Sequence, residues 1–300
     1  MTLNASHNNI TELNEKTAIN LVLLQDIDFS YNQIETLTDL SNISSQLVIV
    51  NFSHNKIHYV EANAFQKLSE LKLLDLSYNF IRVMPDNVFR NNTKLKELNL
   101  ENSQINRLWC VECFQNLIHL NVAHNFIAQT RALIEQLGTK VEVLDLTSNY
   151  LPVAHFSLFE KCHNLQSLNL SQTHLREIYT DSLSTEWNLR TLDLSNNYLK
   201  EIDLKSRGTF KNVIFLYLNG NNLTRLNGMD VVNVPKLELL NISNNSIPCE
   251  DLKDFLRSRQ HYTFAGEPRD QKNGHCRVCL NEVEFGGNII RDAEDIINLK

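Results

Sequence analysis

The sequence has little of several things that would define a different kind of protein. Its 300 residues include only 8 glycines, 5 prolines and 6 cysteines, and its formal net charge is −7. No apolar run approaches the roughly 18 to 20 residues of a membrane span, and no basic stripe is present to neutralise nucleic-acid phosphates. Met1 is followed by neither the basic nor the apolar part of a secretory signal. We therefore expect neither a membrane span nor a nucleic-acid ligand. Because no secretory signal is present, we expect the protein to be either intracellular or incomplete at its N-terminus.

A repeat dominates what is present. Residues 71–81 have the form LxxLxLxxNxI, and the same frame can be laid on the chain eleven times, with 22 to 24 residues between successive asparagine positions. A match of this length and regularity is a strong signal of a repeat architecture. The asparagine positions are Asn8, Asn32, Asn55, Asn79, Ser103, Asn125, Asn149, Thr173, Asn197, Asn221 and Asn245.

The spacing inside the frame predicts the fold. Leu74 and Leu76 are two residues apart, so in a short strand they point to one side, which is the core, while the residues between them face solvent. Phenylalanines that return later in the repeats should pack the outer side, as at Phe65, Phe89 and Phe159. We expect an α/β solenoid, a leucine-rich-repeat horseshoe of about eleven repeats with a parallel concave sheet and a helical C-terminal cap.

This pattern resembles the extracellular leucine-rich-repeat family, whose repeats of about 24 residues carry such a phenylalanine. The resemblance covers residues 1–247 and implies an open solenoid used for binding. No cysteine-bearing cap precedes the first frame near Leu3. We therefore expect sequence upstream of Met1, and with it a secreted or extracellular protein; a cytoplasmic protein is the alternative.

Residues 248–282 should close the far end of the core. Leu252, Phe255 and Leu256 would make one apolar face of a helix. Cys249 at the entrance of that helix, with Cys276 and Cys279 later, looks like the C-terminal capping module of secreted repeat proteins. We expect a disulfide from Cys249 to Cys276 or Cys279, which leaves one cysteine over. Residues 283–300 should form an amphipathic helical tail, with apolar positions at Ile289, Ile290, Ala293, Ile296 and Ile297.

The Pro-Cys-x-x-Leu-x-x-Phe entrance at residues 248–255, the later cysteine pair and the helical tail are similar to the secreted leucine-rich immune proteins of mosquitoes and related insects. In that family the surplus cysteine joins two subunits and a coiled coil follows. The resemblance thus implies a second leucine-rich-repeat chain as a partner through cap and tail, and a complement-like thioester protein as the molecule that the pair holds.

Two CxxC pairs, Cys110–Cys113 and Cys276–Cys279, could suggest a shared zinc site. They lie about six strands apart, which is nearly 30 Å in a stacked sheet, so they cannot share one ion. A local disulfide between Cys110 and Cys113 is the prediction. Free thiols, or a pairing with Cys162, remain open. We expect no metal and no cofactor.

Nine Asn-x-Ser/Thr sequons are candidate glycosylation sites. Several arise from the repeat itself, since an apolar residue followed by Asn-x-Ser fits the frame, so their number supports secretion only mildly. The sequons are at Asn4, Asn9, Asn42, Asn51, Asn91, Asn169, Asn222, Asn241 and Asn244.

Two apolar patches interrupt the otherwise polar side of the strands. Phe215, Tyr217 and Leu239 gather near the C-terminal end, and Ile49 with Leu73 makes a smaller patch. Exposed aromatic side chains concentrate binding energy, so these residues are the candidate partner-binding surface, although the chain's own tail could instead cover the first patch.

No catalytic constellation accompanies these features, since the sequence offers no Ser/His/Asp set and no glycine-rich phosphate loop. We expect a binding protein and not an enzyme. The first interpretation is a secreted protein-binding module of innate immunity that uses its concave face. The alternatives are the ectodomain of a membrane receptor or adhesion protein, and a cytosolic leucine-rich-repeat regulator of an enzyme.

Overall fold

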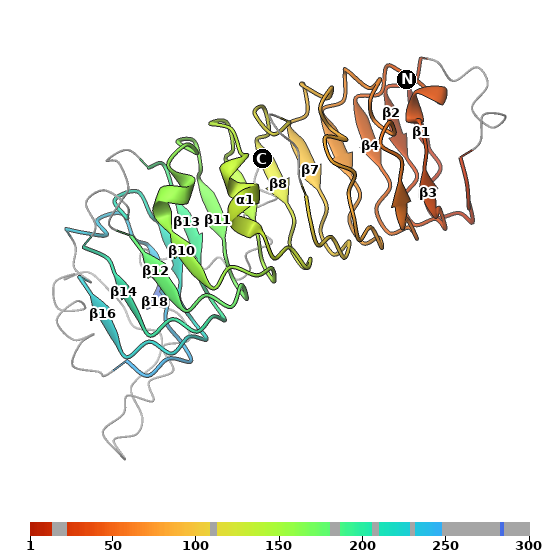
Figure 1. Ribbon diagram of the computed structural model, residues 1–300. Helices are drawn as coiled ribbons and strands as arrows, with labels where there is room; N and C mark the ends of the chain where they lie inside the picture. Colours follow the sequence, from red (N-terminus) through yellow and green to blue (C-terminus); the bar gives the residue numbers. More distant parts are fainter. Residues whose placement is uncertain are drawn as a thin grey trace.

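The chain folds into an open arc of stacked repeats (Figure 1). The computed structural model describes residues 1–13, 23–108, 113–180, 187–205, 210–228, 232–247 and 283–284. Its main feature is a twelve-stranded sheet in which the strands follow one another in chain order, and every pair except the last is parallel. This is the parallel-sheet solenoid that the repeat predicts.

The parallel strands of this sheet line the concave side, and each has three residues. They are β1 (Thr2–Asn4), β2 (Asp26–Asp28), β4 (Ile49–Asn51), β6 (Leu73–Asp75), β7 (Glu97–Asn99), β8 (His119–Asn121), β9 (Val143–Asp145), β11 (Ser167–Asn169), β13 (Thr191–Asp193), β15 (Phe215–Tyr217) and β17 (Leu239–Asn241). In each the middle residue points into the core, as the alternation of the leucines predicts.

Short elements form the other side of the arc, because about 24 residues per repeat leave little room after the strand and its loops. Three two-stranded sheets are present, β3 (Thr36–Leu37) with β5 (Tyr59–Val60), β10 (Val153–His155) with β12 (Glu177–Tyr179), and β14 (Glu201–Asp203) with β16 (Arg225–Asn227). The helical turns are η1 (Leu40–Asn42), α1 (Thr130–Glu135) and η2 (Phe156–Phe159).

The core is one continuous layer between these two sides. Leu74 and Leu76 are fully buried, and so are Phe65, Phe89 and Phe159 on the outer side, which confirms both sequence predictions. The rings of Phe65 and Phe89 stack across neighbouring repeats with centroids 5.4 Å apart. Each repeat therefore buries its apolar residues against its neighbours, which is how a solenoid gains stability.

The ladder asparagines, which are the asparagines at the ninth position of the LxxLxLxxNxI frame, tie the repeats together. The Asn55 side-chain nitrogen donates to the carbonyls of Phe29, Phe52 and Ser53 at 2.9 to 3.2 Å. Its Oδ1 accepts the backbone N–H of Ile34, in the preceding repeat, at 3.0 Å. A buried amide thus satisfies backbone groups of two repeats, and only a side chain that both donates and accepts can do this.

The structure shows what happens where a hydroxyl replaces the ladder asparagine. Thr173 Oγ1 donates to the Leu170 carbonyl at 2.8 Å, but no Oδ1 is present to accept the N–H of Leu151. The backbone carbonyl of Thr173 accepts it instead, at 2.9 Å, and the next residue, His174, has a left-handed φ of +63°. Gln104, which follows Ser103, also has a left-handed φ, at +61°. The residues after the described ladder asparagines are not.

At the C-terminal end the structure describes only two residues beyond position 247. Val283 and Glu284 form β18 and pair antiparallel with β17. The sequence analysis places these two residues in a helical tail, and for them that expectation is wrong. The physical reason is that β17 has an open edge of N–H and C=O groups, which an added strand can satisfy. The remaining predictions for the cap and tail, including Cys249, Cys276 and Cys279, fall on residues outside the described ranges.

Candidate binding surface

The register of the concave sheet brings the predicted partner-binding residues together in two places. Ile49 lies opposite Leu73 on neighbouring strands, and Phe215 lies opposite Leu239, with Tyr217 on the same strand as Phe215. Ile49 is 40% exposed, while Leu73, Phe215 and Tyr217 are half-buried. The sheet therefore offers two separate apolar patches on a polar floor.

Leu239 departs from the expectation of an exposed patch residue. It is only 8% exposed, yet it is not part of the apolar core, because it points to the other side of β17 from Leu240. It also lies beside Glu284 of β18. The C-terminal patch thus consists of Phe215 and Tyr217, and Leu239 forms its buried border.

The floor between the patches is acidic toward the C-terminal half. Asp145 accepts a hydrogen bond from the Thr147 hydroxyl at 2.6 Å, and Asp193 accepts one from the Ser195 N–H at 2.8 Å. Burial raises the pKa of both carboxyl groups, while these hydrogen bonds oppose the rise. Asp145 itself contributes to the raised pKa of Asp193. A bound partner with a cationic group would relieve this repulsion.

The sequons divide by position. Asn51, Asn169 and Asn241 lie on concave strands and are half-buried, and Asn169 Nδ2 reaches Asp145 Oδ2 at 3.4 Å. A glycan at Asn241 would stand beside Tyr217, its register partner. The remaining sequon asparagines are exposed, namely Asn4, which ends the concave strand β1, and Asn9, Asn42, Asn91, Asn222 and Asn244.

Two of the cysteines lie within the described residues. Cys113 is disulfide-bonded, and Cys162 is a free, buried thiol whose pKa burial raises to about 11. A bond between Cys113 and Cys162 is therefore ruled out. Cys110 lies outside the described residues, so its pairing with Cys113 stays a prediction.

A stack of aromatic rings, which the sequence analysis missed, lies in the loops after the first concave strands. His7, Tyr31, His54 and Tyr78 each precede a ladder asparagine, each has a φ near +55°, and their rings stack with centroids 4.2 to 4.3 Å apart. We call these four residues the ring stack. Its signal is readable in the sequence as the alternation Ser-His-Asn, Ser-Tyr-Asn, Ser-His-Asn, Ser-Tyr-Asn over four repeats.

A second set of exposed rings occupies the position after the ladder residue, farther along the chain. Tyr150, His174 and Tyr198 follow one another with centroids 5.9 and 6.0 Å apart, and tilted by 48° and 27°. These rings are farther apart and more tilted than the rings of the ring stack. Phe80 and Phe126 occupy the same position in earlier repeats and are exposed.

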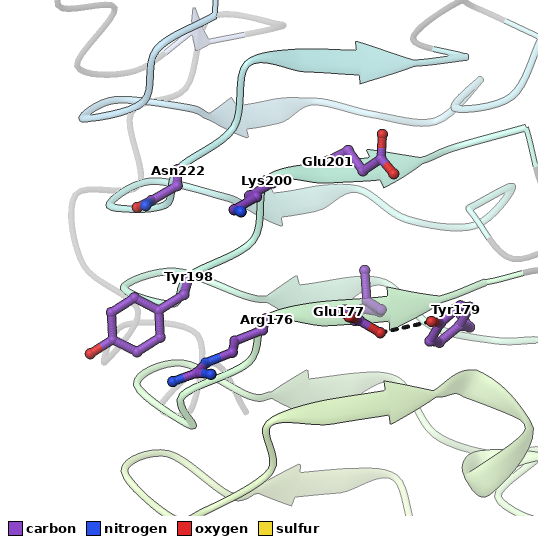
Figure 2. Close-up of a pocket in the computed structure, with 8 residues that line it drawn as sticks. Arg176, Glu177, Tyr179, Tyr198, Lys200, Glu201 and Asn222 are labelled. Atoms are coloured by element: carbon purple, nitrogen blue, oxygen red, sulfur yellow. Dashed lines mark hydrogen bonds between the residues drawn. The ribbon is translucent and has the colours of Figure 1, made fainter.

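Two hollows adjoin these rings. The first hollow has a volume of about 660 Å³ and lies between β12 and β14, which belong to separate two-stranded sheets. Figure 2 shows Arg176, Lys200 and Tyr198 directed to the same side of it, with Glu177 and Glu201 on the strands. The second hollow, of about 680 Å³, is lined by Ser148, Gln172, His174, Asn196 and Tyr198. Tyr198 lines both hollows.

Neither hollow has the features of a catalytic or metal centre. In the part of the chain that the structure describes, no three His, Cys, Asp or Glu side chains gather where they could hold a metal ion. Nor does any helix in those ranges have the length and apolarity to span a membrane. What the surface offers is exposed rings, isolated charges and hydrogen-bonding groups, which is the chemistry of binding.

The family follows from the repeats. The family model for leucine-rich repeats matches residues 45–105, 71–127 and 187–247, in agreement with the stacked strands and the asparagine ladder. Residues 45–127 and 187–247 are therefore leucine-rich repeats. This fold typically serves as a non-enzymatic scaffold for interactions.

Individual similar proteins share parts of the chain or its fold. Tsukushi-A of Xenopus laevis is 39% identical over 70 residues, which are 23% of this chain and 20% of Tsukushi-A. The structure of a TLR13–ssRNA13 complex matches with a TM-score of 0.63 and 22% identity, over 79% of this chain and 39% of that one. The leucine-rich-repeat domain of mosquito APL1B matches with a TM-score of 0.59 and 17% identity, over 92% of both. The chain thus spans a fifth of Tsukushi-A, and the two structures share its fold.

Proposed function

We propose that this chain is an extracellular recognition protein of innate immunity that binds another protein through its concave face. The observation that carries the proposal is the pair of apolar patches, Ile49 with Leu73 and Phe215 with Tyr217, on a polar sheet. Apolar and aromatic side chains on a solvent face are where binding energy concentrates. The carboxyl groups of Asp145 and Asp193 between the patches favour a partner that carries basic groups there.

Two features support an extracellular location. Cys113 is disulfide-bonded, and structural disulfides persist in oxidising compartments. Six sequon asparagines are exposed, so they are accessible to glycosylation. Both features fit a secreted protein and a receptor ectodomain equally well, and neither favours the cytosolic regulator.

The insect immune resemblance adds a more specific form of the proposal. The fold likeness to APL1B supports it, and the surplus cap cysteine would then join a second leucine-rich-repeat chain, with a complement-like thioester protein as the ligand. Light scattering with and without reductant tests the joined pair. A monomer under oxidising conditions would argue against it.

Site-directed photo-crosslinking tests the concave face itself. A crosslinker at Glu97 lies beside Leu73, and one at Thr191 lies beside Phe215. Matched crosslinkers at exposed positions outside the concave strands, Val83 and Lys161, serve as controls. In the extracellular fluid of the organism, we expect one protein band to be captured from both concave positions and from neither control. Equal capture at all four positions would contradict the proposal.

Substitutions separate binding from folding. Phe215→Ala with Ile49→Ala should weaken capture and leave the melting temperature nearly unchanged, since neither side chain is part of the core. Leu216→Ala, between Phe215 and Tyr217 but fully buried, should instead cost about 2 to 5 kcal/mol of stability. An early melt of the surface double variant with unchanged capture would show that the patches serve the fold.

A further inference from the structure

The two hollows contain charges and rings that the concave face does not use. Arg176 and Lys200 line the first hollow, and both are exposed. Neither side chain forms a hydrogen bond or an ion pair with any residue within the described ranges. Figure 2 shows the side chains of Arg176 and Lys200 on neighbouring repeats, directed to the same side. They therefore offer two unpaired cations to one ligand group.

The acidic residues of the same hollow are already partnered. Glu201 Oε2 pairs with Arg225 Nη2 at 2.6 Å, and Glu177 Oε2 accepts the hydroxyl of Tyr179 at 2.7 Å. They leave the two cations free, and each carboxylate keeps a further oxygen that can accept a hydrogen bond. A ligand that suits this hollow carries one anionic group together with hydroxyl donors. A polyanion suits it poorly, because these carboxylates would repel it.

The second hollow continues the first past Tyr198. Its other lining residues, Ser148, Gln172, His174 and Asn196, are all polar and carry no formal charge when the imidazole is neutral. Tyr198 is 49% exposed and stands between the two hollows. A ring flanked by hydrogen-bonding amides and hydroxyls gives an apolar platform with polar edges. Together the hollows make a shallow groove with one cationic and one neutral compartment.

We propose that this groove binds an acidic oligosaccharide. A sugar carboxylate lies between Arg176 and Lys200, an adjacent neutral sugar lies in the second hollow, and Tyr198 packs against the sugar face between them. The volumes of about 660 and 680 Å³ fall in the range of small-molecule sites. This surface is distinct from the concave strands, so the site is additional to the protein-binding function.

The sequon at Asn222 provides a built-in check. Asn222 lines the first hollow and is exposed, so a glycan attached there would occupy the space that the acidic sugar needs. Protein made in a host without N-glycosylation should therefore bind the oligosaccharide. Protein that carries a glycan on Asn222 should bind it more weakly, and Asn222→Gln should restore binding in the glycosylating host.

Calorimetry on the full chain, unglycosylated, tests the proposal with three probes: a hyaluronan trisaccharide with a single carboxylate, a neutral chitin oligosaccharide and a hexaglutamate peptide. We expect the hyaluronan probe to bind best and the peptide not to bind. Arg176→Gln with Lys200→Gln should lower hyaluronan affinity about ten-fold or more and spare the chitin probe, because hydrogen bonds to charged groups are among the stronger ones. Tyr198→Ala should weaken both sugars.

The matched control is Arg90→Gln with Lys161→Gln, which removes the same charge at exposed positions outside the groove. It should leave hyaluronan binding unchanged. In the unmutated protein, the bound oligosaccharide should protect Lys200, but not Lys161, from chemical acetylation. The proposal is overturned if neither sugar binds, if hexaglutamate binds as tightly as hyaluronan, or if the control pair loses as much affinity as Arg176 and Lys200.

Discussion

The loops after the concave strands differ between the N-terminal and C-terminal parts of the arc, although they come from the same repeat. In the N-terminal part the residues before the ladder asparagines are the ring stack, whose rings cover one another's faces at 4.2 to 4.3 Å. In the C-terminal part the same positions hold Ser148, Gln172 and Asn196, and these residues line the second hollow. The position before the ladder residue therefore holds stacked rings in the N-terminal part, and polar side chains that line a hollow in the C-terminal part.

The difference teaches how a solenoid can gain a site without changing its core. Core leucines are fully buried in both regions, as Leu74 and Leu168 show. What changes is the size of one exposed side chain per repeat. Rings stabilise their loops by stacking, whereas short polar side chains leave their neighbours, His174 and Tyr198, accessible to a ligand.

The break in the asparagine ladder adds to the difference. Thr173 has no Oδ1, so its carbonyl turns to the N–H of Leu151 and the following His174 becomes left-handed. This conformation costs an L-residue roughly 1 to 2 kcal/mol. His174 then lies tilted between Tyr150 and Tyr198 and lines the second hollow. A single hydroxyl in the ladder thus shapes the open region.

The largest expected contrast is in the ladder itself. Asn55→Ala should cost about 3 kcal/mol of unfolding free energy, because several buried backbone groups lose their partner. Thr173→Ala should cost only about 1 kcal/mol, since its backbone carbonyl, which remains, already serves Leu151. Urea denaturation measures both. Equal losses would mean that the two ladder positions work alike.

A smaller contrast is expected between the two sets of rings. Tyr31 stacks on His7 and on His54, so Tyr31→Ala should cost about 1 to 2 kcal/mol. Tyr198→Ala should stay within about 0.5 kcal/mol of the parent, because its ring is half exposed and loosely packed. Thermal melts of the two variants under one buffer suffice. A larger loss at Tyr198 would assign it a structural role.

The smallest effect concerns the acidic floor of the open region. Burial raises the pKa of Asp193, so its ionised form is disfavoured in the folded protein, and stability falls as the pH rises past the ordinary range of aspartate. Asp193→Asn keeps the acceptor for Ser195 and should be slightly more stable than the parent at pH 7. That gain should vanish below about pH 4, where the parent carboxyl is protonated in both states. A gain that persists at low pH would exclude the charge as its cause.

Much of the fold could be predicted from the sequence because the same pattern of leucine and asparagine recurs eleven times. The frame around Leu74 and Asn79 predicts the concave strand, the side of that strand that faces the core, and the ladder position. Each further copy of the frame predicts the same arrangement. The strand at Val283 and Glu284 could not be predicted this way, because it pairs with the open edge of β17 and no local sequence pattern indicates it.

The candidate site was predictable only in part. Tyr217 stands out because it is aromatic in a polar column, and Phe215 because it is an aromatic residue two positions earlier on the same strand. Arg176 and Lys200 occupy one column of neighbouring repeats and Tyr198 another, and the hollow that they line lies between β12 and β14, which belong to separate sheets. The conformation of His174 depends on which oxygen accepts the Leu151 N–H, and composition alone does not specify this.

The most direct test of this account is the structure of the Thr173→Asn variant. The new amide oxygen should accept the N–H of Leu151, which releases the backbone carbonyl and returns His174 to a negative φ, as at Tyr150 and Tyr198. The second hollow should change shape, and the fold should remain. If His174 keeps its φ near +63° with the amide in place, the ladder break does not shape the open region, and the account is contradicted.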